Sequence, residues 1–74
     1  MNVKDNLRRL REARGLSIRA LAHKAGVGYV SVFRIEAGQQ DPTLSMLVKL
    51  AKALKVTVID LIGQRPAKSK RARR

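Results

Sequence analysis

IRALAHKAGVGYVSVFRIEA, residues 18–37, has the pattern of two short helices joined by a tight turn. Ala22 is small enough to let two helices cross closely. Gly26 suits the left-handed conformation that commonly ends a helix. Apolar residues recur where the two helices and the remaining core would meet, at Leu21, Ala25, Val27, Val32 and Ile35. The stretch therefore predicts a helix-turn-helix motif over residues 18–37.

The second helix of this motif keeps an outer face once its packing residues are assigned. At about 100° per residue, Val32 and Ile35 point toward the core. The residues that point away from them are Val30, Phe33, Arg34 and Ala37, with Tyr29 on the flank near the helix start. An arginine can grip guanine O6 and N7 in the major groove of DNA, and an apolar side chain can contact a thymine methyl. This face is therefore a candidate surface for reading DNA.

Apolar spacing in the rest of the chain predicts three more helices. The first covers residues 3–14 and ends at Gly15, with Asn2 available as its cap. Its inner positions are Val3, Leu7 and Leu10. The expected fold class is therefore all-α, a compact five-helix domain over residues 3–62.

Three hydroxyl residues mark predicted helix starts. Ser17 and Thr43 are placed to accept hydrogen bonds from first-turn amides of the second and fourth helices. Thr57 and Asp60 have the spacing of a capping box, which predicts a short fifth helix. The inner stripe predicted for the fourth helix is Leu44, Leu47, Leu50, Ala51 and Leu54.

The chain is strongly basic, with 17 Lys and Arg against five Asp and Glu and a formal net charge of +12. Such a charge implies a polyanionic partner. Six basic residues lie in the last ten positions without an acidic one: Arg65, Lys68, Lys70, Arg71, Arg73 and Arg74. Eleven basic and five acidic side chains remain, a net +6, so the body is basic too. Residues 63–74 are predicted to be a disordered basic tail that follows DNA phosphates or is a passive end.

Composition argues against several classes of function. Seventy-four residues allow one small domain, and the absence of cysteine excludes disulfides and thiolate metal sites. The single histidine, His23, is expected to be a solvated helix residue or a phosphate contact. Because no carboxylate pair, metal set or activated nucleophile can be assembled, we expect no enzyme, metal or cofactor. With no secretory signal and no apolar run near about 18 residues, a cytoplasmic location is expected.

Three stretches together resemble the phage-repressor and Cro-like (XRE-type) helix-turn-helix family. They are ALAHKAGV, SVFRIEAG and DPTLSMLVKLAKALKV, and a short VIDLI segment follows them. The resemblance covers residues 3–62 and implies a lambda-repressor-like domain that binds double-stranded DNA. The chain departs from the family at Ile18, where a glutamine usually bonds a phosphate.

The resemblance also implies which side chains contact DNA. By resemblance, base contacts are expected from Tyr29, Val30 and Arg34. Phe33 is added to them because its apolar side chain lies on the same outer face and can contact a thymine methyl. Contacts with the DNA backbone are expected from Arg11, Ser17, Arg19, Ser31, Gln39, Gln40 and Thr43. In the family an arginine at the position of Arg11 pairs with the glutamate that is Glu36 here, so Glu36 is expected to support the recognition helix.

For several of these residues the sequence leaves a second interpretation open. Arg11 and Glu36 could be unconnected surface charges, and Arg19 could be exposed without a partner. The two glutamines could be ordinary polar loop residues. Val30 and Phe33 are apolar residues on a basic surface, and they could bind a protein partner instead of bases.

The fifth helix carries more apolar residues than its own core needs, namely Val58, Ile59 and Ile62. In relatives this region often forms a two-fold dimer contact, so we expect a homodimer, with core completion as the other interpretation. The expected function is sequence-specific transcriptional regulation by a repressor on a two-fold symmetric operator. Since 74 residues show no effector domain, promoter occlusion is the simplest mechanism.

Two other functions stay open. An antitoxin-type interaction module would bind a toxin partner through the surface at residues 58–62 and regulate its own operon. A nucleoid-type protein without sequence preference is compatible with the charge of +12. Co-purification of a second chain would identify the first, and a comparison of random with selected DNA would identify the second.

Overall fold

The computed structural model describes residues 3–63, which form five helices and contain no strand. The helices are α1 (Val3–Ala13), α2 (Ile18–Ala25), α3 (Tyr29–Glu36), α4 (Leu44–Leu54) and α5 (Val58–Ile62). The predicted all-α, five-helix fold is confirmed. Among residues 3–63, none of the helices is long and apolar enough to cross a membrane. The suggested cap Asn2 and all but Gly63 of the predicted tail lie outside the described residues.

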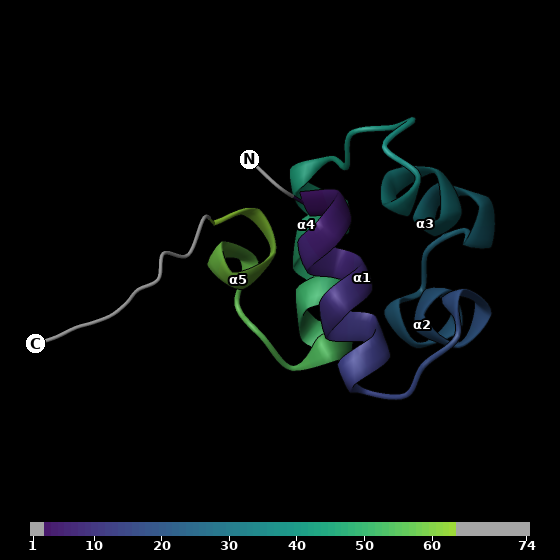
Figure 1. The fold of residues 1–74 in the computed structure, drawn as a ribbon, viewed down its shortest axis with the longest axis horizontal. Helices are drawn as coiled ribbons and strands as arrows, with labels where there is room; N and C mark the ends of the chain where they lie inside the picture. Colours follow the sequence, from purple (N-terminus) through teal and green to yellow (C-terminus); the bar gives the residue numbers. More distant parts are fainter. Residues whose placement is uncertain (1–2, 64–74) are drawn as a thin grey trace, which may run out of the picture.

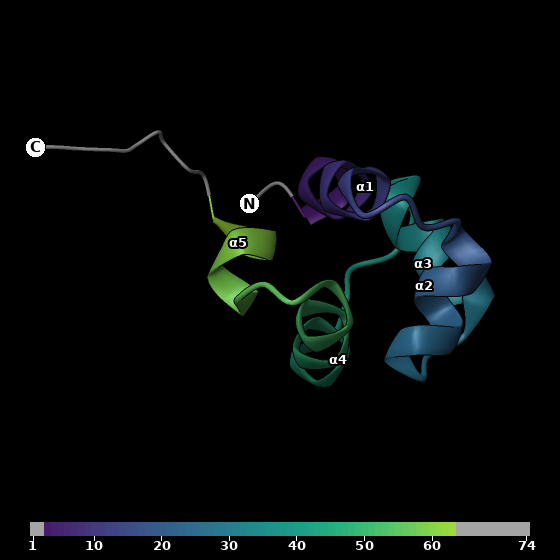
Figure 2. The same ribbon diagram turned by 90° about the horizontal axis from the view of Figure 1, so that it is seen from below.

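The helices are arranged with α1 and α4 in the middle, the α2–α3 pair on one side and α5 on the other (Figures 1 and 2). α2 packs against α3 and α4, while α1 packs against α3 and α5. α4 also contacts α5, so α5 packs against both of the central helices. As a result, the helix-turn-helix motif and the short last helix lie on opposite sides of the domain.

One apolar core joins all five helices. The large side chains with almost no exposed surface are Leu7, Leu21, Val32, Ile35, Leu50, Leu54 and Leu61. Burying a side chain of this size contributes about 1.5–3 kcal/mol. The core therefore fixes how α2 and α3 sit against α1 and α4.

Leu44 is a predicted core residue that the structure places at the surface, with 70% of it exposed. At about 100° per residue, it lies at the side of the stripe formed by Leu47, Leu50 and Leu54. It is also the first residue of α4, next to the loop that leads into the helix. The prediction for Leu44 was wrong because apolar spacing alone does not show where a buried stripe ends.

The predicted helix caps are present. The side-chain oxygens of Ser17 and Thr43 accept hydrogen bonds from the amides three residues further on, at 3.0 and 3.1 Å. Thr57 and Asp60 form a capping box, with distances of 3.1 and 2.9 Å. These bonds satisfy amides that would otherwise lack a partner within their helix.

Asn6 anchors the end of α5 to α1. Its side chain is buried, and its Nδ2 donates to the carbonyl oxygens of Leu61 at 2.9 Å and Gly63 at 3.1 Å. Asn6 lies on the same face of α1 as Val3 and Leu7, which are also buried. A polar residue on an otherwise apolar stripe was the available signal for this role.

Candidate nucleic-acid interface

The turn between α2 and α3 has the predicted geometry. Gly26 adopts the left-handed conformation, with φ 72° and ψ 33°, and caps the end of α2. Ala22 is almost fully buried, and its carbonyl oxygen accepts a hydrogen bond of 3.0 Å from the amide of Val27. α3 then starts at Gly28, which provides no side-chain cap. The small residue and the left-handed glycine thus let α3 cross close to α2.

The inner face of α3 is held by packing and by one ion pair. Val32, Ile35 and Glu36 are all at most 3% exposed. Arg11 donates from Nε to Glu36 Oε2 at 2.6 Å and from Nη2 to Glu36 Oε1 at 3.0 Å. The predicted pairing of Arg11 with Glu36 is confirmed, so these residues are not unconnected surface charges.

Arg11 also donates from Nη1 to the carbonyl oxygen of Leu16 at 2.7 Å. Three of its five N–H donors are therefore used within the protein. Hydrogen bonding to Glu36 raises the pKa of Arg11 above its ordinary value, and burial opposes this rise. Only 12% of the Arg11 side chain is exposed. Two of its N–H donors remain for a phosphate, so the contact of Arg11 with the DNA backbone stays a prediction.

Arg8 is a second cation near Glu36 that the sequence analysis did not single out. Its Nε lies 3.6 Å from Glu36 Oε1, and 57% of its side chain is exposed. Arg8 and Arg11 are three residues apart and so lie on neighbouring positions of one helix face. Unlike Arg11, the exposed Arg8 side chain makes no hydrogen bond to the buried Glu36 carboxylate, so solvent screens its longer contact more strongly. The Arg11 pair is therefore the main anchor of α3.

The outer face of α3 is exposed, as its helical phase predicted. Tyr29, Val30 and Phe33 are 39%, 52% and 48% exposed, and Arg34 is exposed beside them. Within residues 3–63, the Arg34 side chain takes part in no hydrogen bond or ion pair. The four residues expected to contact bases thus share one surface.

The residues expected to contact the DNA backbone lie around this surface in different settings. Exposed positions are those of Ser17, Arg19, Gln39 and Thr43, and half-buried positions are those of Ser31 and Gln40. The hydroxyls of the two capping residues accept bonds from the protein but each keeps a proton to donate. Ile18, which replaces the usual glutamine, packs against the core. This core contact gives Ile18 a structural role at that position.

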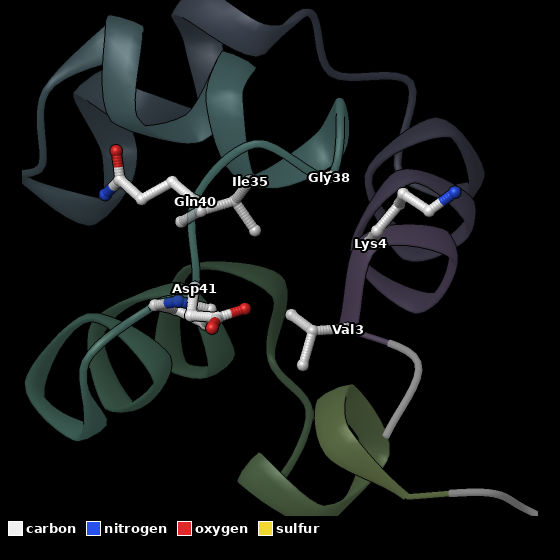
Figure 3. Close-up of a pocket in the computed structure, with 7 residues that line it drawn as sticks. Val3, Lys4, Ile35, Gly38, Gln40 and Asp41 are labelled. Atoms are coloured by element: carbon white, nitrogen blue, oxygen red, sulfur yellow. The ribbon is translucent and has the colours of Figure 1, made fainter.

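A pocket of about 130 Å³ lies between the start of α1 and the loop after α3 (Figure 3). Its lining residues are Val3, Lys4, Ile35, Gly38, Gln40, Asp41 and Pro42. Gly38 has φ +78°, and a Cβ there would lie 3.1 Å from Lys4 Cδ. Figure 3 shows the Gln40 side chain directed away from Lys4. Glycine thus allows the loop to pass close to α1 as it leaves the recognition helix.

One contact in this region was not predicted. The guanidinium carbon of Arg19 lies over the Tyr29 ring, 4.3 Å from the ring centroid. This cation–π contact joins the first turn of α2 to the first residue of α3. Sequence spacing gave no signal for it, because it depends on how the two helices cross.

The profile of a helix-turn-helix family matches residues 7–61 of this chain. The chain belongs to this helix-turn-helix family. Helix-turn-helix proteins of the XRE type are DNA-binding transcriptional regulators, so the predicted family and the expected absence of enzymatic function are both confirmed.

Curated and solved relatives agree with this family membership. The chain is 31% identical over 64 residues to the cryptic phage CTXphi transcriptional repressor RstR of Vibrio cholerae serotype O1, covering 86% of this chain and 57% of RstR. It is 37% identical to the restriction-modification controller protein C.AhdI from Aeromonas hydrophila, with a TM-score of 0.78, covering 81% of this chain and 91% of C.AhdI. The SinR protein/SinI protein complex contains a chain 30% identical, with a TM-score of 0.81, and the match covers 84% of this chain and 61% of that one.

The relatives differ in the share of their length that matches this chain. The helix-turn-helix domain described here spans 57% and 48% of two curated relatives. The C.AhdI match, by contrast, extends over nearly the whole of that protein.

Proposed function

We propose that this protein represses transcription by binding, as a homodimer, to a two-fold symmetric DNA operator, with α3 in the major groove. The main observation behind this proposal is the exposed outer face of α3. Arg34 stands there without a protein partner among residues 3–63, beside exposed Val30 and Phe33. The inner face of the same helix is fixed by the Arg11–Glu36 pair. A fixed helix that presents a free arginine is suited to reading base edges.

Each part of this surface has a separate role in the proposal. The Arg34 guanidinium grips O6 and N7 of a guanine, and Val30 and Phe33 contact thymine methyl groups. Exposed backbone-contact residues such as Ser17, Arg19 and Gln39 fix the register on the phosphates without reading sequence. Specificity therefore comes from α3, and much of the affinity comes from the basic surface around it.

Dimerisation is proposed to occur through α5. Ile59 is 70% exposed, whereas Val58 and Ile62 are half-buried against the core. α5 lies on the side of the domain away from α2 and α3 (Figure 2). Pairing through α5 leaves both copies of α3 free to enter successive major grooves, about 34–36 Å apart. A bound dimer would then exclude other proteins from the promoter, and RstR is itself named a transcriptional repressor.

The first experiment selects binding sites from a random pool of duplex DNA with the full chain. We expect a two-fold symmetric site that binds at least about a thousandfold more tightly than random duplex at the same salt concentration. Equal affinity for selected and random DNA would contradict sequence-specific regulation and favour a nucleoid-type protein. Repression is tested by placing the selected site over a promoter and measuring the transcript with and without the protein.

The second experiment tests the dimer with Ile59→Asp, and Leu44→Asp is a matched control because both residues are 70% exposed. We expect Ile59→Asp to sediment as a monomer and to bind a full site much more weakly than the parent. Leu44→Asp should remain a dimer. Loss of the dimer in the control alone would place the interface on α4, and a monomeric parent at high micromolar concentration would contradict dimerisation.

The basic tail is proposed to add phosphate contacts, although residues 64–74 lie outside the described part of the structure. Truncation after Gly63 removes six cations and no acid. Each phosphate contact that is lost should flatten the slope of log K against log salt by about 0.9. Affinity for selected and random duplexes should fall equally. An unchanged slope would make the tail a passive end.

A second candidate function is an antitoxin-type module, favoured by the exposure of Ile59 on a short terminal helix. The similar chain in the SinR protein/SinI protein complex was solved together with a second protein, so a partner protein is compatible with this fold. In that case a second small protein should co-purify with the chain, and Ile59→Asp should release it. Because both candidates act on DNA and the similar proteins named above come from bacteria, whose DNA lies in the cytoplasm, we propose a cytoplasmic location.

A further inference from the structure

Arg19 and Tyr29 form a contact between the two helices of the motif. Arg19 is the second residue of α2 and Tyr29 is the first residue of α3. The distance of 4.3 Å from the guanidinium carbon to the ring centroid is well inside the range of a cation–π interaction. The contact therefore favours one direction of a long side chain that would otherwise sample many rotamers.

The contact leaves the donors of Arg19 available. A cation–π contact needs no hydrogen-bond acceptor, so it satisfies none of the five N–H donors of the guanidinium. Within residues 3–63, the Arg19 side chain makes no hydrogen bond or ion pair. It also lies in the first turn of α2, whose N-terminus favours a negatively charged group. Arg19, held over the Tyr29 ring with its donors unused within residues 3–63, is thus able to bind an anion.

We propose that the Tyr29 ring is a platform that positions Arg19 to bind a DNA phosphate. This inference rests on the proposed function, and it gives Tyr29 a positioning role in place of the base contact expected from the resemblance. The ring holds the guanidinium before DNA arrives, so less rotamer freedom is lost on binding. The aromatic face carries the effect, and the phenolic hydroxyl is dispensable for it.

The tyrosine variants separate these two parts of the side chain. Tyr29→Phe keeps the ring and removes the hydroxyl, and Tyr29→Leu removes the ring. The duplexes are one selected site and one random sequence of the same length, each measured with the full chain over a range of salt. Tyr29→Phe should bind like the parent. Tyr29→Leu should bind both duplexes about two- to fivefold more weakly, the factor that an exposed cation–π contact supports.

A double-mutant cycle with Arg19→Ala tests whether the ring acts through Arg19. Arg19→Ala should weaken binding to both duplexes equally and flatten the salt slope by about 0.9. Adding Tyr29→Leu to Arg19→Ala should then cause no further loss. Phe33→Leu is the matched control, because it also removes an exposed aromatic ring from α3. Its effect should be the same with and without Arg19.

The contact itself can be measured without DNA. In the parent and in Tyr29→Phe, the ring current should shift the NMR signals of the Arg19 Hδ protons upfield. In Tyr29→Leu this shift should disappear while the melting curve still shows a cooperative fold. An unshifted Arg19 signal in the parent would overturn the inference before any binding is measured.

The outcomes distinguish this inference from the proposed function. A parent that binds no duplex at low salt would overturn the proposed function and this inference with it. A parent that binds, with Tyr29→Leu equally costly in the presence and absence of Arg19, would overturn the platform alone. A loss in Tyr29→Phe on the selected site but not on the random duplex would overturn it as well, and would make Tyr29 a base reader.

Discussion

The two faces of α3 differ in how far their side chains are buried and paired within the protein. On the inner face, Val32 and Ile35 are fully buried and both carboxylate oxygens of Glu36 are hydrogen-bonded to Arg11. On the outer face, Phe33 is half exposed and Arg34 has no partner within residues 3–63. The difference indicates that the two faces of this eight-residue helix have separate roles. The inner face stabilises the fold, and the outer face is left for a ligand.

The largest expected effect comes from breaking the inner face with Glu36→Gln. The substitution leaves the Arg11 guanidinium, whose side chain is 12% exposed, with only the exposed Glu12 carboxylate as a counter-charge, 3.9 Å from Nη2. Removing one partner of a fully buried ion pair costs about 3–5 kcal/mol, and because this pair is part-buried and glutamine keeps one acceptor oxygen, we expect a loss of about 2–3 kcal/mol. That is a large share of the roughly 5–15 kcal/mol by which small domains are stable. Chemical denaturation should show this loss, and DNA binding should weaken with it because α3 loses its anchor.

The double variant with Arg11→Met is the control for this prediction. Once the arginine is gone, a neutral residue at position 36 no longer leaves a charge unpaired. The double variant should therefore be more stable than the sum of the two single effects predicts. Additive losses within error would show that the pair seen in the structure does not couple the two helices energetically.

A smaller effect is expected at the end of α3 from Gly38→Ala. The left-handed backbone at φ +78° disfavours a Cβ, and that Cβ would lie 3.1 Å from Lys4 Cδ. A non-glycine residue in this conformation costs about 1–2 kcal/mol. Gly38→Asn should cost less, since asparagine tolerates the left-handed region. If asparagine and alanine proved equally costly in thermal denaturation, the contact with Lys4 would be the cause instead of the backbone.

The smallest effect is expected at the start of α3 from Gly28→Ser. Gly28 has the extended backbone of an N-cap, with φ −71° and ψ 139°, but no side chain to accept a bond. Its added Cβ would have ordinary clearance, 3.9 Å from Ser31 Oγ. A serine hydroxyl should stabilise the helix by a few tenths of a kcal/mol, or about 1–3 °C in melting temperature. Gly28→Ala should lower the melting temperature, and a lower value for both variants would contradict the cap.

Much of the fold could be predicted from the sequence because it depends on local signals. Apolar spacing located the five helices, and hydroxyl residues located three of their starts. Gly26 identified the turn through its backbone freedom. Leu44 was wrongly predicted to be buried, because periodicity does not show which neighbouring elements cover a helix end.

The candidate site was less accessible to sequence reasoning, since part of it depends on how helices cross. The resemblance predicted the Arg11–Glu36 pair. The bond from Arg11 to the Leu16 carbonyl and the contact of Arg8 with Glu36 could be seen only in the structure. The contact of Arg19 with Tyr29 likewise joins residues on different helices. Exposure of the outer face, by contrast, followed directly from helical phase.

The most direct test of the central claim is the specificity of Arg34→Ala compared with Arg19→Ala. Both remove an exposed arginine from the motif, one from the outer face of α3 and one from the first turn of α2. Affinities are measured at fixed salt for the selected site and for each of its single-base variants. Arg34→Ala should lose about 1–3 kcal/mol of discrimination at one symmetric pair of positions and keep most of its affinity for random DNA. Arg19→Ala should lose affinity uniformly, and a uniform loss in Arg34→Ala as well would contradict the claim that the outer face of α3 reads bases through Arg34.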